Sequence, residues 1–251
     1  MMKDNCIYLK DGIEGLRSLP AGSVDMLLTD PPYGTTRNSW DIPLPLPELW
    51  EAVEYAVKPN GAILLFAQCP YDKILGMSNL SMLRYEWIWY KDRGTGFLNA
   101  KRMPLKKAEN ILVFYKHLPT YNPQFEYREP YLRTETAGYS TNYNKFSFSS
   151  SESPDGKRFP GNVVQFPAVN KGIHPTQKPL GLCEYLIRTY TNEEELVVDI
   201  CAGSGTTAVA CINTNRRYIC FENSPKYYAL ASERIRQKIE EDNYTIYDYI
   251  R

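Results

Sequence analysis

The chain has 251 residues, of which 43% are apolar, which is enough to bury one sizeable core within a single domain over residues 1–251. Its 29 basic and 29 acidic residues cancel, so net charge alone does not indicate a nucleic-acid partner. No stretch approaches the roughly 20 apolar residues that span a bilayer. No apolar signal core follows the N-terminus either, so we expect no membrane partner and a cytoplasmic location. With two histidines and no Cys-x-x-Cys pair, we expect no metal site.

The apolar pattern predicts strands that alternate with helices along the chain. The expected elements are strand 24–29, helix 46–57, strand 62–67, helix 70–82, strands 85–91 and 109–116, helix 179–190, strand 196–200, helix 205–214, strand 217–222 and helix 225–240. This alternation indicates an α/β fold, a mostly parallel sheet with helices on both faces. Ligands of such sheets bind beyond the carboxyl ends of the strands, where Asp30 and Asp199 both fall.

The segment Thr29-Asp30-Pro31-Pro32-Tyr33-Gly34 directly follows the first expected strand. Taken alone, it is also compatible with a plain turn after a core strand. Proline fixes φ and has no N–H, so the carbonyls of Asp30 and Pro31 are held free of strand partners and can accept other hydrogen bonds. An aromatic exocyclic amine is a suitable donor, and the Tyr33 ring can stack on the base that carries it. The segment predicts a site for a flipped nucleobase.

A second strand-like run, 196–200, leads into the glycine-containing turn 202–207 and a helical pattern. Glycines let a ligand approach the backbone closely, and the free N–H groups of the helix start point toward it. Glu222 follows at about the 20-residue offset where an acidic residue commonly holds ribose hydroxyls. Ala208 stands where a dinucleotide turn would have its third glycine. The pattern therefore favours an adenosine ligand without a pyrophosphate, such as S-adenosyl-L-methionine, over NAD.

Together these segments resemble the amino-group DNA methyltransferases of the β order, in which the catalytic Asp-Pro-Pro-Tyr motif precedes the cofactor motif. The resemblance covers roughly residues 5–116 and 172–238. Further segments that carry it are Tyr8-Leu-Lys-Asp-Gly-Ile around Asp11, Lys58-Pro-Asn-Gly-Ala, Glu109-Asn-Ile-Leu-Val-Phe-Tyr-Lys116 and His174-Pro-Thr-Gln-Lys-Pro179. It implies a Rossmann-like methyltransferase fold with a permuted motif order.

The resemblance also implies S-adenosyl-L-methionine as the cofactor. Asp11 would contact the adenine, Glu222 the ribose, and Asp199 with the turn that follows it the methionine. The segment 174–178 would close over the methionine carboxylate. The residues assigned to the cofactor are Asp11, Asp30, His174, Thr176, Lys178, Asp199, Ala202, Gly203, Ser204, Gly205, Thr206, Thr207, Glu222 and Asn223.

The catalytic set implied is Asp30, Pro31, Pro32 and Tyr33. Hydrogen bonds from the amine to Asp30 and to the Pro31 carbonyl would stabilise the positive charge that develops as the methyl arrives. By family habit, aspartate at position 30 favours adenine N6, while serine is commoner in cytosine-N4 enzymes. A cytosine-N4 enzyme and a catalytically silent DNA- or cofactor-binding module remain as alternatives. Double-stranded DNA is the expected partner, and the resemblance also allows a homodimer and a cognate restriction endonuclease.

Residues 117–172 depart from the alternation of strands and helices and are rich in Tyr, Phe, Ser, Gly and Pro. Enzymes of the β order carry their target-recognition region here, so the resemblance implies that this insert reads the DNA sequence. Before it, the run 91–107 has six basic residues (91, 93, 101, 102, 106, 107) against one acidic residue, Asp92. Phosphate contacts supply most sequence-independent affinity for DNA. The residues expected to contact DNA are Lys101, Arg102, Lys106, Lys107, Arg128, Arg133, Lys145 and Arg158.

Overall fold

The computed structural model describes residues 2–36, 38, 40–132, 138–140, 144–146, 152–170 and 172–249. The chain divides into two compact units, of which unit 1 comprises Met1–Asn122 and Asn162–Arg251, and unit 2 comprises Pro123–Gly161. Unit 2 lies within the expected insert, 117–172, and the flanking residues of that range belong to unit 1. The C-terminal part of the range belongs to unit 1 because strand β12 (Val163–Gln165) pairs in parallel with strand β4 (Leu83–Thr95) of the main sheet.

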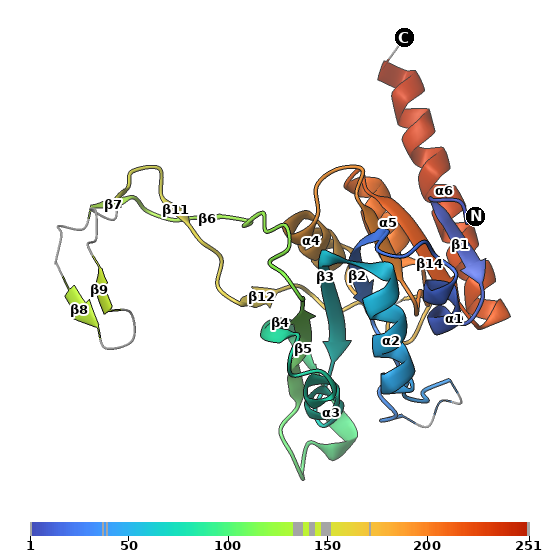
Figure 1. Ribbon diagram of the computed structural model, residues 1–251, viewed down its shortest axis with the longest axis horizontal. Coiled ribbons are helices and arrows are strands. Elements are labelled where there is room, and N and C mark those ends of the chain that lie inside the picture. Colours follow the sequence, from blue (N-terminus) through green and yellow to red (C-terminus); the bar gives the residue numbers. More distant parts are fainter. Residues whose placement is uncertain are drawn as a thin grey trace. The chain divides into compact units, whose positions relative to one another are not determined.

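Unit 1 is built on an eight-stranded sheet with the order β1-β14-β13-β2-β3-β5-β4-β12 (Figure 1). Its remaining strands are β1 (Cys6–Leu9), β2 (Val24–Thr29), β3 (Val57–Ala67), β5 (Lys106–Phe114), β13 (Leu196–Asp199) and β14 (Arg217–Glu222). Every neighbouring pair is parallel except the two that β5 makes with β3 and β4. The mostly parallel sheet expected from the alternating pattern is confirmed.

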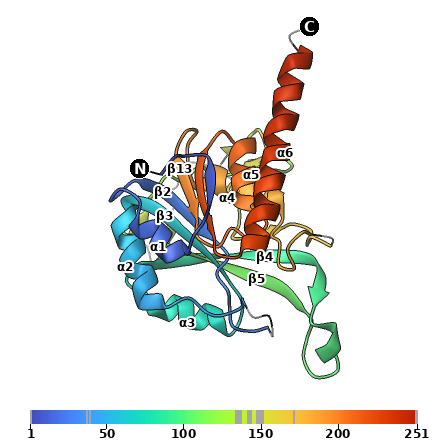
Figure 2. The ribbon, with the colours of Figure 1, turned by 90° about the vertical axis from the view of Figure 1, so that its right-hand side faces the viewer.

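Helices cover both faces of this sheet. They are α1 (Gly12–Arg17), α2 (Leu46–Ala56), α3 (Tyr71–Ser78), α4 (Leu180–Tyr190), α5 (Thr206–Asn213) and α6 (Pro225–Tyr249). Figure 2 shows α1, α2 and α3 on one side of the strands and α4, α5 and α6 on the other. Within the part of the chain that the structure describes, no helix is both long and apolar enough to cross a membrane.

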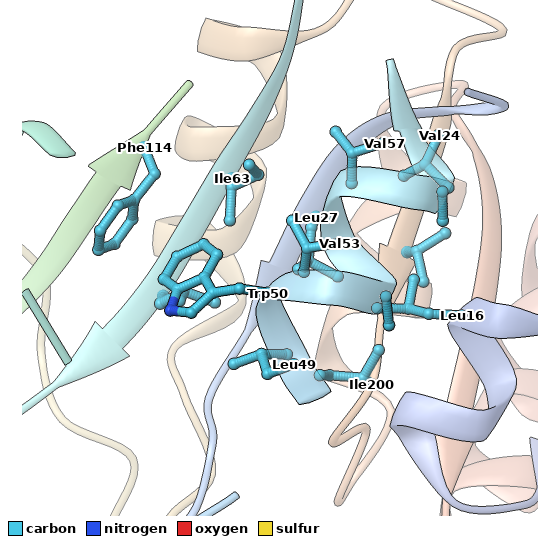
Figure 3. Packing of buried hydrophobic residues seen from close by; sticks show 14 of the residues in the cluster. Leu16, Val24, Leu27, Leu49, Trp50, Val53, Val57, Ile63, Phe114 and Ile200 are labelled. Carbon is cyan, nitrogen blue, oxygen red and sulfur yellow. The ribbon is translucent and has the colours of Figure 1, made fainter. Parts of the chain in front are cut away.

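Helix α2 shows how the sequence pattern generates the first core. Its apolar residues recur at spacings of three and four, which places Leu49, Val53 and Ala56 on one face. All three are fully buried. Figure 3 shows Val53 beside Leu27 of β2 and Leu49 near Ile200, in the core that also contains Ile63 of β3.

Strand β3 separates the two cores because successive side chains of a strand point to opposite faces. Ile63 and Leu65 belong to the core under α1, α2 and α3, whereas Leu64 and Phe66 belong to the core under α4, α5 and α6. A strand buried on both faces reads as a continuous apolar run, which is why 62–67 was recognisable in the sequence.

Short elements escaped the sequence pattern. Strand β1 has four residues at the edge of the sheet, and helix α1 has only six, too few for a periodicity to emerge. Strand β3 begins at Val57 instead of 62, and α6 continues to Tyr249 instead of ending at 240. The helix expected over 70–82 ends at Ser78.

Unit 2 contains short antiparallel pairs. Among its described residues, β6 (Glu126–Tyr127) pairs with β11 (Lys157–Arg158), β7 (Tyr131–Leu132) with β10 (Glu152–Ser153), and β8 (Gly138–Ser140) with β9 (Asn144–Phe146). The rings of Phe125 and Phe159 lie 5.0 Å apart, and Lys157 Nζ lies 4.0 Å from the Phe125 ring centroid. Some aromatic side chains of unit 2 therefore pack against residues of the same unit.

Candidate active site

The two motifs meet because β2 and β13 are neighbouring parallel strands, with Leu27 opposite Val198. Thr29, the last residue of β2, donates from Oγ1 to Oδ1 of Asp199, the last residue of β13, at 2.7 Å. The Asp-Pro-Pro-Tyr turn and the glycine turn therefore start side by side at the carboxyl edge of the sheet, where open α/β folds bind their ligands.

Asp199 is the anchor of this junction. Besides the bond from Thr29, its carboxylate accepts from Cys201 N at 3.0 Å and from Thr207 Oγ1 at 2.6 Å. The residue is only 4% exposed, and burial raises the pKa of Asp199 to about 6, although these hydrogen bonds oppose the shift. Asp199 thus ties β2, the glycine turn and the start of α5 together.

The turn between β13 and α5 depends on two glycines in left-handed backbone conformations, Gly203 with φ 52° and Gly205 with φ 72°. Arg234 of α6 holds the turn from outside, since its Nη1 lies 3.0 Å from the Ser204 carbonyl oxygen and 3.0 Å from Thr206 Oγ1. The main chain of the turn is therefore shaped before any ligand arrives.

Glu222 ends β14 beside the same turn. Its two carboxylate oxygens accept from Gly203 N and from Ser224 N, each at 2.8 Å, and burial raises the pKa of Glu222. Asp11 follows β1, the strand that pairs with β14, and caps α1, with Oδ1 accepting from two N–H groups of the first helical turn at 3.0 Å. Both carboxylates are thereby oriented by backbone donors.

A buried cluster of charges surrounds Asp30. Lys178 Nζ donates to Asp30 Oδ2 and lies 3.0 Å from Glu109 Oε1. Lys91 Nζ lies 2.6 Å from the other oxygen of Glu109. The Tyr33 hydroxyl donates to Asp30 Oδ1 at 2.6 Å and lies 3.0 Å from Glu109 Oε1. Two carboxylates and two ammonium groups balance here, where an uncompensated charge would be costly.

The members of this cluster differ in their affinity for protons. Burial raises the pKa of Asp30, and the attraction of Lys178 only partly opposes that effect. For Glu109 burial acts in the same direction, but Lys178 and Lys91 together outweigh it, so the pKa of Glu109 is lowered. Burial disfavours the charged form of Lys178, yet the two carboxylates raise the pKa of its ammonium group. The same cluster therefore shifts the pKa values of its two carboxyl groups in opposite directions.

The ring of His174 contacts the rings of Trp40 and Tyr227, with centroids 5.2 and 4.2 Å away and planes inclined by 51° and 63°. Thr176 Oγ1 lies 3.0 Å from His174 Nδ1. Burial, reinforced by the charge of Lys178, lowers the pKa of His174 to about 4, so the ring is neutral at neutral pH. A Cβ at Gly203 would lie 3.7 Å from this ring, which places His174 over the glycine turn.

One cavity of about 920 Å³ joins these parts. Sites for small molecules typically have about 300–1,000 Å³, so the cavity lies at the upper end of that range. The predicted residues on its wall are Asp11, Asp30, Pro31, Pro32, Tyr33, His174, Thr176, Lys178, Asp199, Ala202, Gly203, Ser204, Thr206, Thr207, Glu222 and Asn223. Gly205 does not line it and serves as the N-cap of α5.

The side chains of the segment 174–178 point to two different parts of the cavity. His174 covers the glycine turn, whereas the Lys178 ammonium group points to Asp30 and Glu109. The sequence pattern could not reveal this, because the three charged side chains come from separate segments that only the folded sheet brings together.

The residues expected to contact DNA fall into different environments. Lys101 and Arg102 are exposed. Lys106 Nζ lies 3.1 Å from Gln68 Oε1, and Lys107 Nζ lies 5.4 Å from the centroid of the Tyr90 ring. Arg128, Arg133, Lys145 and Arg158 are the expected contacts in the insert.

Within unit 2, exposed Arg128 pairs with Glu126 at 2.6 Å. Arg158 donates to Ser153 and to the Glu129 carbonyl oxygen, and its guanidinium lies 4.2 Å from the Tyr131 ring centroid. Its donors therefore serve the packing of unit 2. Arg133 and the side chain of Lys145 lie outside the described residues.

Several residues of the site were not identified from sequence. Thr29, Trp40, Glu109 and Tyr227 line the cavity, although the sequence pattern alone assigns no role to Glu109. Lys91, counted in the basic run 91–107, is 7% exposed and pairs with Glu109, so it belongs to the site instead of the basic surface. Its position inside the strand 85–91, within an apolar alternation, was a signal for burial.

Sequence comparisons agree with this geometry. A model of the DNA methylase family matches residues 24–233. Type II methyltransferase M.HpaI of Haemophilus parainfluenzae is 30% identical over 92% of this chain and 74% of the relative. DNA adenine methyltransferase YhdJ of Escherichia coli (strain K12) is 25% identical over 90% of this chain and 80% of the relative.

Solved structures share the fold. The PvuII DNA methyltransferase (cytosine-N4-specific) has a TM-score of 0.66 and 19% identity, with 95% of this chain and 92% of that chain covered. The complex of M1.HpyAVI with SAM has a TM-score of 0.62 and 24% identity, with 91% and 98% covered. Because the family model spans both motifs and most of the sequence, the chain belongs to the amino-group DNA methyltransferases, the S-adenosylmethionine-dependent family that modifies adenine N6 or cytosine N4.

Proposed function

We propose that the protein is a site-specific DNA adenine-N6 methyltransferase that acts on a flipped base. One observation carries this proposal: Asp30 and the glycine turn line the same cavity, and the strand ends that bear them are joined by the hydrogen bond from Thr29 to Asp199. A methyl acceptor held at Asp30 and a cofactor held at the turn would therefore be neighbours, as an in-line displacement requires.

The residues around the turn suit the cofactor. Glu222 offers carboxylate oxygens for ribose hydroxyls, and the left-handed Gly203 leaves the backbone open to close approach. His174 would cover the methionine side as a neutral ring, and Asp11 would face the adenine. When bound, S-adenosyl-L-methionine supplies a methyl group already activated by its sulfonium charge.

Asp30 would hold the target amine. Each carboxylate oxygen has two lone pairs, so Asp30 can accept an N–H of the amine while it keeps its bonds from Tyr33 and Lys178. The Pro31 carbonyl would accept the other N–H. As the methyl arrives, positive charge develops on the nitrogen and strengthens both hydrogen bonds.

The methylated nitrogen must then lose a proton. Because burial raises the pKa of Asp30, this carboxylate is suited to accept that proton once the amine has become acidic. Glu109, whose pKa is lowered by Lys178 and Lys91, stays ionised and keeps Lys178 charged beside Asp30.

The face of the Tyr33 ring would stack on the flipped base. The ring stacks on Tyr71, with centroids 5.5 Å apart and planes inclined by 25°, while its hydroxyl is held by Asp30. Stacking on such an oriented ring offsets part of the few kcal/mol that unstacking a base costs.

Adenine is favoured over cytosine by aspartate at position 30 and by the relative YhdJ, whose name gives adenine as its target. Cytosine N4 remains the alternative product, because its exocyclic amine could be held in the same way. We further propose double-stranded DNA as the substrate, with Lys101 and Arg102 on phosphates and unit 2 as the sequence reader. A homodimer and a cognate endonuclease are expectations from the resemblance and from the Type II relatives.

The test is product analysis. The protein is incubated with methyl-labelled S-adenosyl-L-methionine and unmethylated genomic DNA, and the digested nucleosides are identified by mass spectrometry. We expect N6-methyladenine, and about 100-fold less of it with Asp30→Ala at retained cofactor affinity. N4-methylcytosine would support the cytosine alternative. Cofactor and DNA binding without any methylated base would identify a silent module.

A further inference from the structure

The loop that connects β4 to β5 carries exposed apolar side chains at its tip. Phe97 is 80% exposed and Leu98 is 98% exposed, and they are adjacent in the sequence. Met103 and Leu105 in the same loop are 50% and 42% exposed. A monomeric protein rarely gathers large apolar side chains on one projecting segment without a partner for them.

This tip has a defined conformation. Gly96 takes a left-handed conformation with φ 87°, and a 3-10 turn over Phe97–Asn99 follows it. The carbonyl oxygen of Asn99 accepts from Arg102 N at 2.8 Å and from Met103 N at 3.0 Å. The strand pairing closes the loop where Thr95 lies opposite Lys106. The two most exposed side chains are therefore presented by an ordered turn.

The loop lies at the same edge of the sheet as the active site. Strand β5 is antiparallel to β3, and β4 is antiparallel to β5, so β4 runs in the direction of β3 and β2. The loop that follows β4 thus emerges where β2 delivers Asp30. Thr95, the last residue of β4, lines the cavity. Figures 1 and 2 show the loop projecting beyond the sheet.

The charge of the loop indicates which partner covers it. Residues 96–107 contain Lys101, Arg102, Lys106 and Lys107 and no acidic residue. A polyanion matches this charge, whereas a second copy of this chain, with zero net charge, would gain less from it. DNA also offers apolar side chains a place, because bases can unstack to admit them.

We propose that Phe97 and Leu98 form a wedge that enters the DNA duplex beside the target base, and that the wedge stabilises the flipped state. This inference rests on the proposed function, since it adds to that site the element that keeps the base out. Flipping leaves a gap in the stack, and the loss of stacking opposes the flipped state. Apolar side chains in the gap restore contacts to the neighbouring bases, while Lys101 and Arg102 hold the adjacent phosphates.

The test compares Phe97→Ser/Leu98→Ser with a matched control, Leu118→Ser. Leu118 is 77% exposed but follows β5, which ends at the opposite edge of the sheet. The substrates are two duplexes with the site mapped on genomic DNA, one fully paired and one with an abasic position opposite the target. The abasic duplex has lost the base pair that the wedge must help to break.

We expect the double variant to methylate the paired duplex about tenfold or more slowly than wild type, and the abasic duplex within about threefold of wild type. Leu118→Ser should match wild type on both. With 2-aminopurine at the target, the fluorescence rise on binding should be lost in the double variant only. A second variant, Leu98→Trp, keeps a large apolar group and should retain the rise.

Equal losses on both duplexes, or no loss on the paired one, would overturn the wedge. A change from dimer to monomer in light scattering of the double variant, without a change in fluorescence, would show that copies of the chain meet at this loop and would also overturn it. Failure of the proposed adenine specificity looks different: the mapped site would then carry N4-methylcytosine, and the comparison of the double variant with wild type on the paired and abasic duplexes would still test the wedge.

Discussion

The Tyr33 hydroxyl donates a hydrogen bond of 2.6 Å to Asp30 Oδ1. The ring on which we propose that the base stacks is therefore bonded to the carboxylate that would accept from the amine of that base. The same hydroxyl lies 3.0 Å from Glu109 Oε1. Stacking and charge stabilisation are therefore coupled through one phenol, and substitutions at Tyr33 can separate them.

Tyr33→Phe keeps the ring and removes the bond to Asp30, and Tyr33→Ala removes both. We expect Tyr33→Phe to preserve the 2-aminopurine signal of flipping and to slow methyl transfer about tenfold, the loss expected for one hydrogen bond to a charged group. Tyr33→Ala should reduce the flipping signal as well. If the two variants lose the signal equally, the ring face is not what holds the base.

Lys178 and Glu109 should tune Asp30 in opposite directions. The charge of Lys178 lowers the pKa of Asp30, and that of Glu109 raises it. In a plot of methylation rate against pH, the transition due to Asp30 should therefore move to higher pH in Lys178→Met and to lower pH in Glu109→Gln. A neighbouring charge typically shifts a pKa by about one to three units. Lys178→Arg is the control that keeps the charge. Shifts in the same direction would contradict this electrostatic arrangement.

The bond between Thr29 and Asp199 should contribute to stability. Thr29→Val deprives a buried carboxylate of one donor, which we expect to lower the free energy of unfolding by about 1.5–3 kcal/mol. Urea denaturation measures the change. Thr35→Val, an exposed site in the following loop, should stay within about 0.5 kcal/mol of wild type. Equal stability of both variants would mean that Asp199 does not depend on Thr29.

His174 should titrate well below the usual range of histidine. Since the folded-state pKa of His174 is lowered from 6.5 to about 4, the unfolded chain binds more protons between these values. This contribution to stability is present above pH 6.5 and is lost as the pH falls toward 4. NMR titration of the imidazole signals measures the pKa, with His117→Asn as the assignment control. A midpoint near 6.5 would contradict the burial of this ring beside Trp40 and Tyr227.

Lys101 and Arg102, the exposed basic pair, should contribute to DNA affinity independently of the DNA sequence. Lys101→Ala/Arg102→Ala is expected to weaken binding similarly on cognate and unrelated duplexes and to reduce the salt slope by about two. Fluorescence anisotropy at several salt concentrations gives the slope. The matched variant Arg128→Ala, in unit 2, should instead change which sequence is preferred. A basic-pair variant with an unchanged slope would remove these residues from the phosphate contacts.

Most of the fold was predictable because its central strands are buried on both faces and its main helices are amphipathic. The run 62–67 and the apolar face of α2 belong to this class. Elements that depend on a neighbour were not predictable. Strand β12 forms only because the edge of β4 accepts it, and its three residues carry no periodicity of their own.

The sequence by itself determined the two motifs, their order along the chain and their position at strand ends, because strand pattern, proline and glycine act locally. Only the tertiary structure decided that Lys91, Glu109 and Lys178 meet around Asp30. Their positions come from two antiparallel strands and a distant loop, and a balance of buried charges exists only once those segments are packed together. Local sequence encodes backbone conformation, whereas the electrostatic environment of a site depends on side chains distant along the chain.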